Sequence, residues 1–321
     1  MILFRTEACR VEPGGFCRAR FLAALLKPGH SVQVSENRDR PPRSKPPPDG
    51  ETPLDTRRLE RFAEEGLACV VFDLERFSPE DNRLITWCRE NKIATVCFAG
   101  PLAIPKPVDY VIDCDPAAPG RYPSGQKGLF GTEFAVLHHR FRHFHMISRR
   151  YRTKIDRIIW ILGPGIPYRL TRRLVDVLLR YGFKVKIHPA TFLKRAHLKG
   201  LKRRYPNLRI TGKPETLARP LFEADLALLS PGSHLFEAAA CGTPAIMLVS
   251  NGKEGEIARS FSKHRLGSLS SPGWEKDPGV LVQQIRDFEA DSFSEMGRCG
   301  KEKVDGRGAY RVRDFIADLH A

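Results

Sequence analysis

Short apolar segments and amphipathic segments alternate along most of the chain. In the first half, the apolar segments cover residues 2–5, 31–34, 69–72, 94–98 and 110–112. Segments with helical spacing of apolar positions separate them at residues 18–26, 59–65 and 79–91. Short continuous apolar runs are typical of strands that are buried on both faces of a sheet. The alternation therefore predicts a parallel sheet with helices on both faces.

The same alternation resumes at residue 158 and continues toward the C-terminus. Strands are predicted at residues 158–162, 184–187, 208–211, 225–229, 245–249 and near 268, and helices at 170–181, 217–223, after 250 and from 278 onward. A chain of 321 residues is long enough for two hydrophobic cores. We therefore predict an α/β protein with two Rossmann-like, doubly wound domains that face a central cleft. The predicted boundaries are 1–150 for the N-terminal domain and 151–321 for the C-terminal domain with its last helices.

Residues 37–56 interrupt the alternation because they are rich in proline and charge. A segment of this composition does not bury enough apolar surface to form a core. We expect it to be an exposed, mobile loop within the N-terminal domain and not a domain boundary.

The most informative stretch runs from residue 229 to residue 245. Ser230, Gly232 and Ser233 follow a predicted strand, at a point where the chain must bend sharply and leave backbone N–H groups uncovered. Such N–H groups at the start of a helix form a binding site for phosphate. His234 would contact that phosphate or cap the helix, and the carboxylate of Glu237, one helical turn further on, would hold a ribose hydroxyl pair. The stretch predicts a nucleotide-diphosphate pocket without a metal, and the alternative is an ordinary strand–loop–helix joint.

The net charge of the chain limits the classes of partner that it is expected to bind. It has 53 Lys and Arg against 37 Asp and Glu, a net charge of +16, and the excess is concentrated between Arg140 and Arg204. This excess suits an anionic small molecule, an anionic membrane surface or a nucleic acid. Nucleic acid is not expected, because no other binding signature is present and residues 140–145 also fit an amphipathic connecting helix.

No apolar run approaches the ~18 residues of a membrane span. The N-terminal stretch is too short and too soon charged for a signal peptide, so we expect a cytoplasmic protein that could lie against the inner face of the membrane.

Metal and disulfide chemistry find little support in the residue spacing. The eight cysteines are scattered, with no C-x-x-C pair and no histidine at ligand spacing, so neither a zinc site nor a disulfide framework is expected. Among the clustered histidines at 138–145, His139 and His143 share a helical face, but no carboxylate joins them. A basic connecting helix is the favoured interpretation, and we predict no cofactor besides the substrate itself.

The stretch 229–245 resembles a known donor-binding turn. Its pattern Ser-x-Gly-Ser-x-x-x-Glu-x-x-x-x-Gly-x-Pro is that of the MurG-like glycosyltransferases of GT-B architecture. Three further segments, at residues 4–8, 131–137 and 304–312, resemble the UDP-sugar hydrolases of pseudaminic-acid biosynthesis and the related spore-coat polysaccharide proteins. Together these segments extend over nearly the whole chain. The resemblance implies two Rossmann domains that bind a UDP-sugar in surface-glycan or nonulosonic-acid biosynthesis, with the acceptor or sugar side in the domain 1–150 and the nucleotide-sugar site in the domain 151–321.

The chain departs from that family in the loop after its first strand. The family has a Gly-x-Gly-His-x-x-Arg loop, whose histidine is thought to prepare the attacking water. Here Gly14 and Gly15 remain as expected substrate contacts, but Phe16 stands at the histidine position and cannot accept a proton. Other carboxylates are therefore candidates for the general base. These are Glu12 in the same loop, with Glu7 beside it, and Asp73 at the end of a predicted core strand; each could instead be a solvated or capping group.

Three functions follow from these patterns. The first is hydrolysis of a UDP-sugar at its anomeric carbon. The second is glycosyl transfer from a UDP-sugar to an anionic or lipid-linked acceptor, and the third is UDP-sugar binding without catalysis. In each of them Asn251, at the position where relatives carry an Asn-Gln pair, would line the sugar pocket.

Overall fold

The computed structural model describes residues 1–7, 17–37, 56–74, 77–99, 108–161, 166–188, 195–211, 217–288 and 290–319. They form two compact units. Of the described residues, the first unit contains those up to Val136 and again from Arg307 onward, and the second contains those from Leu137 to Gly306. Each unit is built around its own parallel six-stranded sheet, which confirms the predicted α/β class with two doubly wound Rossmann-like parts.

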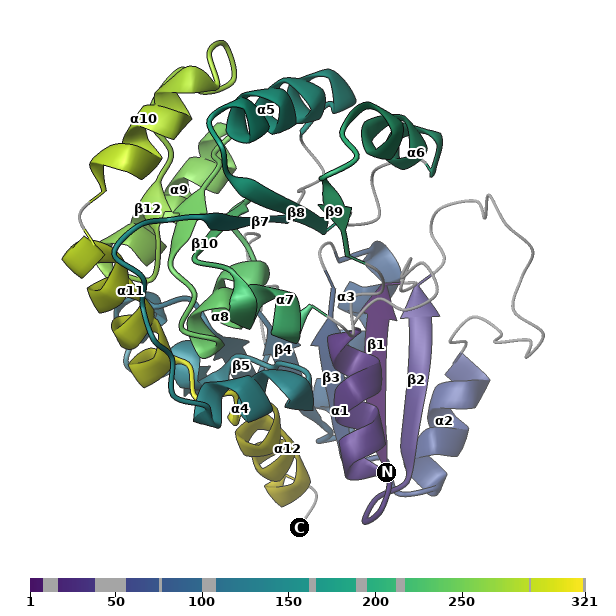
Figure 1. The fold of residues 1–321 in the computed structure, drawn as a ribbon. Coiled ribbons are helices and arrows are strands. Elements are labelled where there is room, and N and C mark those ends of the chain that lie inside the picture. Colours follow the sequence, from purple (N-terminus) through teal and green to yellow (C-terminus); the bar gives the residue numbers. More distant parts are fainter. Residues whose placement is uncertain are drawn as a thin grey trace. The chain divides into compact units, whose positions relative to one another are not determined.

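The sheet of the first unit has the strand order β2-β1-β3-β4-β5-β6 (Figure 1). Its strands are β1 (Ile2–Glu7), β2 (Val32–Asn37), β3 (Cys69–Asp73), β4 (Ala94–Phe98), β5 (Tyr110–Asp113) and β6 (Lys127–Phe130). All neighbouring strands pair in parallel. The edge strand β6 was not predicted, because Lys127 and Gly128 give this short segment neither an apolar run nor an alternating pattern.

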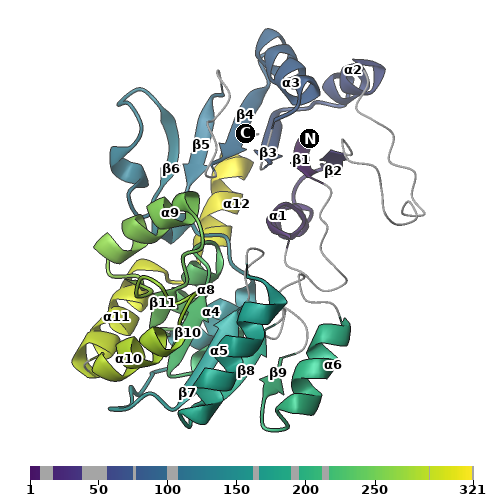
Figure 2. The ribbon, with the colours of Figure 1, turned by 90° about the horizontal axis from the view of Figure 1, so that it is seen from above.

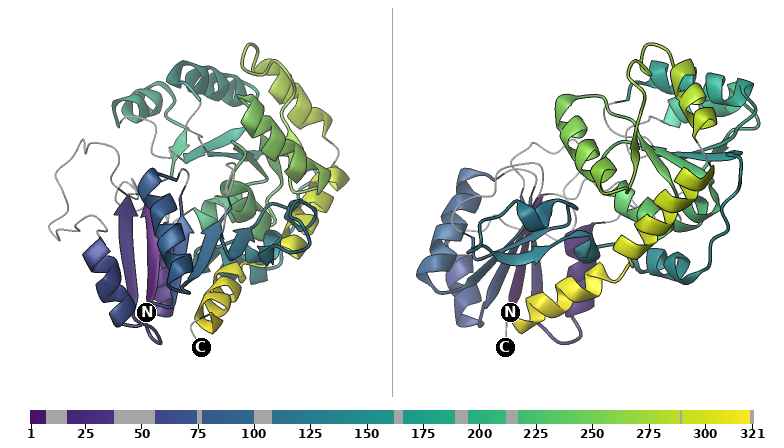
Figure 3. Two further views of the ribbon diagram at one scale, coloured as in Figure 1. Left: turned by 180° about the vertical axis from the view of Figure 1, so that it is seen from behind. Right: turned by 90° about the vertical axis from the view of Figure 1, so that its left-hand side faces the viewer.

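Helices cover both faces of this sheet because successive residues of a strand point to opposite sides. Ile2 and Phe4 pack in one core with α1 (Arg18–Leu26) and α12 (Gly308–Asp318). Leu3 packs in the other core with α2 (Thr56–Glu64) and α3 (Pro79–Glu90). Figure 1 shows α1 in front of the sheet, and the view from behind shows α2 and α3 on the other face (Figure 3, left).

The chain enters the second unit earlier than the predicted boundary at residue 150, and it leaves that unit again before its C-terminus. Val312 and Ile316 of α12 are fully buried in the core of the first unit, which is why this last helix belongs there. Gly308 permits the return, because a Cβ at this position would lie 2.3 Å from the carbonyl oxygen of Ala135. The predicted segments 131–137 and 304–312 thus pack against each other, with η2 (Thr132–Phe134) in contact with α12.

The sheet of the second unit has the strand order β12-β11-β10-β7-β8-β9. Its strands are β7 (Arg157–Ile161), β8 (Lys184–His188), β9 (Arg209–Ile210), β10 (Leu226–Leu229), β11 (Ala245–Met247) and β12 (Ser268–Leu269). The helices are α4 (His139–Met146), α5 (Tyr168–Arg180), α6 (Arg195–Arg204), α7 (Ala218–Glu223), α8 (His234–Ala240), α9 (Gly252–Lys263), α10 (Gly279–Asp287) and α11 (Ala290–Lys303). Helix α6 was not predicted, and Figure 2 shows it beside β9. The short 3₁₀ helix η1 (Ala118–Gly120) lies in the first unit.

The core of the second unit includes Trp160 of β7, which is fully buried. It packs with Leu174 and Leu178 of α5 and with Leu281 and Ile285 of α10. On the other face, α7 contacts β7 and α8 contacts β10. This packing fixes α8 against the sheet and so fixes the turn that precedes it.

The proline-rich loop, the cysteines and the possibility of a membrane span were also subjects of prediction. Residues 38–55 of the proline-rich loop lie outside the described part of the chain. Cys69, Cys88, Cys97 and Cys241 are free and buried, as small hydrophobic residues are, whereas Cys17 is disulfide-bonded, which the scattered spacing did not predict. In the described ranges, no helix has the length and apolar character needed to cross a membrane.

Candidate nucleotide-binding site

The turn between β10 and α8 lies at a special position of the second sheet. From β7, the chain builds β8 and β9 on one side and then crosses over to build β10 on the other side. The strand order therefore reverses between β7 and β10. Open α/β sheets bind ligands at the carboxyl ends of their strands at such a reversal. The turn Ser230–Ser233 follows the carboxyl end of β10 and therefore lies at this reversal.

The turn leaves three backbone donors available. Gly232 has a φ of +155°, and a Cβ built on it would meet no atom within 4 Å, so the turn is open on this side. The amides of Leu235 and Phe236 donate to the carbonyls of Gly232 and Ser233 at 3.0 and 3.1 Å. The amides of Gly232, Ser233 and His234 find no acceptor among the residues that the structure describes. A buried amide would be costly without a partner, but Ser233 is exposed and Gly232 and His234 are partly exposed.

His234 and Glu237 form an ion pair directly after this turn. Nδ1 of His234 donates to Oε2 of Glu237 at 2.5 Å, and the Glu237 residue is only 8% exposed. Burial disfavours the protonated ring, but the adjacent carboxylate outweighs this effect and raises the pKa of His234 above its ordinary value. Charge-assisted hydrogen bonds of this kind hold both groups in place. The sequence predicted both residues as site residues but not the bond between them.

His188 is a neighbour of the His234–Glu237 pair that the sequence reasoning missed. It ends β8, is 2% exposed, and its Nδ1 lies 2.7 Å from Oγ1 of Thr211. Because that hydroxyl donates to the carbonyl of Ile187, Nδ1 of His188 is the donor and Nε2 is left as the acceptor. Burial lowers the pKa of His188 to about 4, the charge of His234 adds to this effect, and Glu237 opposes it. His188 thus belongs electrostatically to the His234–Glu237 cluster. The strand predicted at 184–187 ended one residue before His188. Asp73 was singled out because it ends a core strand, and the same argument would have identified His188 at the carboxyl end of β8.

Asn251 and Ser230 occupy the same edge of the second sheet. Asn251 is exposed and caps α9, since its side-chain oxygen accepts the amide of Glu254 at 3.0 Å. Ser230 directly follows β10 and is partly exposed. The side chain of Glu254 accepts the amide and the hydroxyl of Ser250, each at 2.8 Å, which fixes the start of α9. The sugar contact of Asn251 and the nucleotide contact of Ser230 stay predictions.

The candidate catalytic residues belong to the N-terminal part of the chain. Asp73 ends β3, next to β1, where the strand order of the first sheet also reverses. Both of its carboxylate oxygens accept hydrogen bonds from the Arg18 guanidinium, which lies 4.0 Å above the Phe98 ring. Glu12, Gly14, Gly15 and Phe16 lie outside the described residues, as does the side chain of Glu7. Their predicted roles therefore stay predictions.

A metal site does not emerge from the described part of the chain. No three His, Cys, Asp or Glu side chains gather there in a way that could hold a metal ion. His139 and His143 lie on α4, the predicted connecting helix, which precedes β7.

Comparisons with known proteins identify the fold. No family model and no curated protein matches the chain. Among solved structures, it is similar to MurG from Acinetobacter baumannii, with 14% identity, a TM-score of 0.62 and 99% of each chain covered. It is also similar to a UDP-glucose:anthocyanidin 3-O-glucosyltransferase in complex with UDP, with 12% identity and a TM-score of 0.58 over 99% of this chain and 98% of that one. A third is the UDP-GlcNAc 2-epimerase from Neisseria meningitidis bound to UDP-GlcNAc, with 10% identity and a TM-score of 0.56 over 99% of each chain. The chain has the GT-B fold, as predicted.

Proposed function

We propose that this protein is a glycosyltransferase of GT-B architecture that takes its sugar from a UDP-linked donor. The observation that carries the proposal is one arrangement in the second unit. Three amides without an acceptor in the described structure lie beside the His234–Glu237 pair, at the point where the strand order reverses. A glucosyltransferase that binds UDP and an epimerase that binds UDP-GlcNAc share this fold.

The chemistry of the arrangement suits a departing nucleoside diphosphate. Transfer of a sugar requires that the negative charge that develops on the diphosphate be stabilised as the anomeric bond breaks. The amides of Gly232, Ser233 and His234 supply donors that are already oriented by the turn. The carboxylate of Glu237 can accept the ribose hydroxyls while it keeps the His234 ring in place. Together they would bind the donor and stabilise the leaving group without a metal ion.

Transfer is favoured over the hydrolysis that the narrower family resemblance implies. Phe16 stands where that family carries its histidine, so the group that would prepare water is missing from that position. Among the structural neighbours are glycosyltransferases. An incoming hydroxyl still needs a base. Asp73 is the candidate base whose side chain the structure describes, and Arg18 holds it at the carboxyl end of β3. An anionic or lipid-linked acceptor would suit the basic chain.

The test is to incubate the protein with radiolabelled UDP-glucose and UDP-GlcNAc and to follow both UDP release and the fate of the sugar. Each donor is offered alone, with a solvent extract of lipids, and with a pool of small polar acceptors. We expect UDP release that depends on an acceptor, with the label transferred to it. Release without acceptor would instead establish hydrolysis, and binding of UDP without release would establish a non-catalytic protein.

Two variants connect this assay to the site. Glu237→Ala should abolish acceptor-dependent release because the donor no longer binds. Asp73→Asn should keep UDP binding and lose turnover if Asp73 is the base. Asn82→Ala, at an exposed position of α3, is the matched control and should retain full activity.

A further inference from the structure

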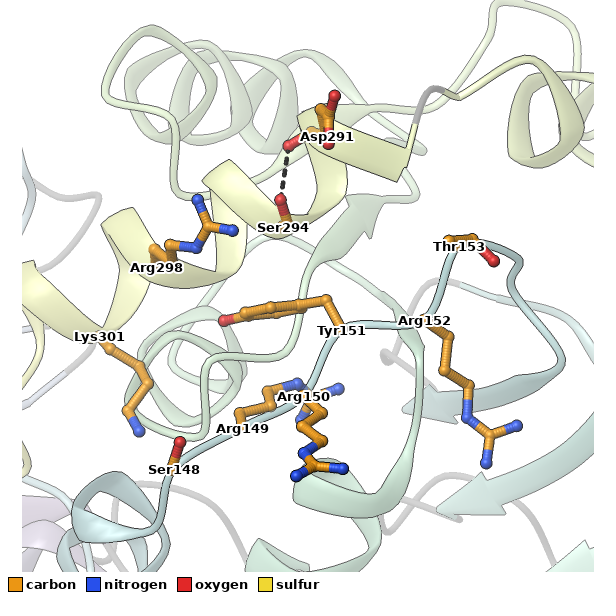
Figure 4. Close-up of a pocket in the computed structure, with 10 residues that line it drawn as sticks. All are labelled: Ser148, Arg149, Arg150, Tyr151, Arg152, Thr153, Asp291, Ser294, Arg298 and Lys301. Atoms are coloured by element: carbon orange, nitrogen blue, oxygen red, sulfur yellow. Dashed lines mark hydrogen bonds between the residues drawn. The ribbon is translucent and has the colours of Figure 1, made fainter.

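The second unit has another charged site at the opposite end of α8. A cavity of about 600 Å³ lies between α11 and residues 148–153, the segment that connects α4 to β7 (Figure 4). Five of its ten lining residues are basic, and only Asp291 is acidic. Lys301 and Tyr151 reach within about 3 Å of the place that a Cβ on Gly242 would occupy, just beyond the end of α8. The cavity and the turn before α8 are therefore separate sites.

Two of the five basic residues have partners that explain them. Arg149 donates to the carbonyls of Phe222 and Ala224 and so caps the C-terminal end of α7. Arg152 forms ion pairs with Asp225 at 3.5 Å and with Asp156 at 3.7 Å. These two side chains stabilise the fold, and we do not count them among the residues that contact a ligand.

The other three basic residues are not neutralised by carboxylates. Arg150, Arg298 and Lys301 form no ion pair with the described residues. Arg150 and Arg298 are exposed, and Arg298 lies 5.9 Å above the Tyr151 ring. Burial and the nearby charge of Arg149 lower the pKa of Lys301, although Cys241 opposes the shift. Three cations without a carboxylate partner in the described structure therefore line this cavity, and a bound anion would compensate their charge.

An exposed apolar pair directly precedes the segment that lines this cavity. Met146 and Ile147 are 75% and 38% exposed, and they are two of the three large hydrophobic residues that are exposed in the described structure. The ammonium group of Lys301 donates to the carbonyl of Ile147 at 2.8 Å, which joins the pair to the wall of the cavity. Exposed aliphatic side chains beside unneutralised cations are typical of surfaces that lie in a membrane interface.

We propose that this basic cavity face, formed by Met146, Ile147, Arg150, Arg298 and Lys301, docks on an anionic lipid bilayer. The three cations bind lipid phosphates, and the two apolar side chains enter the boundary between head groups and acyl chains. The aliphatic pair favours a bilayer over nucleic acid, since single-stranded nucleic acids are held by aromatic stacking. The inference does not depend on the proposed sugar transfer, because it concerns a different surface.

The experiment measures co-sedimentation of the full chain with two kinds of vesicle. One is phosphatidylcholine alone, and the other is equal parts of phosphatidylcholine and phosphatidylglycerol. We expect binding to the anionic vesicles only. The double variant Arg150→Glu/Arg298→Glu should weaken this binding by at least about 25-fold, because the loss of each basic side chain near the surface alone costs about fivefold. Met146→Ser should weaken it about fivefold.

Matched controls separate this face from general charge and general hydrophobicity. Arg172→Glu/Arg203→Glu changes two exposed arginines of α5 and α6 and gives the same net charge. Tyr181→Ser removes the third exposed hydrophobic side chain. Both should bind anionic vesicles within about threefold of wild type, since screening limits distant charges. Circular dichroism and thermal unfolding of every variant check that the chain is folded.

Three results would overturn the proposal. The first is equal binding to both kinds of vesicle or to neither. The second is wild-type binding by the Arg150/Arg298 variant, or an equal loss in the control pair. The third is loss of binding to poly(U) RNA in that variant while its vesicle binding is unchanged, which would assign the face to nucleic acid.

Discussion

At the strand-order reversal of the first sheet, the chain places Asp73, and at the same point of the second sheet it places the turn Ser230–Ser233. The two positions are topologically equivalent. In the first sheet the polar group is ion-paired within the unit, since Arg18 donates to both carboxylate oxygens of Asp73. In the second sheet the amides of the turn have no acceptor in the described structure. Equal topology therefore provides two different edges. The closed edge carries an ion-paired carboxylate that can act as a base but does not attract an anion, and the open edge carries amides that can bind one.

The largest expected effect is a loss of UDP affinity when the open edge of the second sheet is changed. Glu237→Ala should weaken UDP binding about 100-fold, because hydrogen bonds from the ribose to a charged carboxylate are lost and His234 loses its partner. Calorimetric titration with UDP measures this change. Glu223→Ala, at the C-terminal end of α7, is the control and should bind UDP within about twofold of wild type. Equal affinities of Glu237→Ala and wild type would remove Glu237 from the site.

The pH dependence of stability tests the buried member of the cluster. The folded-state pKa of His188, about 4, lies below its ordinary value of 6.5. Its contribution to stability is therefore present above pH 6.5 and is lost as the pH falls toward 4. The loss is about 3 kcal/mol of unfolding free energy. Urea unfolding between these pH values measures it.

His188→Gln should be less sensitive to acid by that amount, since glutamine can still donate to Thr211 but does not titrate. His264→Gln, on the C-terminal end of α9, should follow the wild-type curve. An unchanged slope in the His188 variant would mean that the ring is not held neutral by burial.

The closed edge should respond in stability and not in nucleotide binding. Asp73→Asn leaves the Arg18 guanidinium without its anionic partner and should lower the unfolding free energy by about 2 kcal/mol. Its affinity for UDP should stay at the wild-type value. Thermal unfolding and calorimetry measure the two quantities separately. A loss of UDP affinity as large as that of Glu237→Ala would show that the two edges are not functionally different.

The smallest effect is expected at Asn251. Removing its side chain in Asn251→Ala deletes the cap of α9 and should cost about 1 kcal/mol of stability. UDP affinity should not change, because the side-chain oxygen is engaged by the amide of Glu254. Ser262→Ala, further along α9, serves as the control for stability. Weakened UDP binding with unchanged stability would identify Asn251 as a nucleotide contact instead of a cap.

The sequence predicted most of the fold because the strands are short apolar runs between amphipathic helices. The helix at residues 18–26 and the strand at 94–98 have the predicted bounds. The exceptions have physical reasons. β6 lacks an apolar run, and α12 returns to the first unit through a close contact between Gly308 and Ala135 that no local pattern encodes.

Only the part of the candidate site that consists of backbone amides could be predicted from the sequence. Small residues after a strand indicated the turn, whereas the His234–Glu237 bond and the approach of His188 depend on side-chain directions across separate elements. The pairing of Asp73 with Arg18 is of the same kind, since 55 residues separate the two. Such long-range contacts follow from packing and cannot be inferred from spacing along the chain.

The most direct measurement is hydrogen exchange of the backbone amides at Gly232, Ser233 and His234, with and without UDP. If these amides bind the diphosphate, UDP will slow their exchange, and uridine, which has no phosphate, will not. Exchange in this turn that UDP leaves unchanged, while protection develops elsewhere in the chain, would contradict the account.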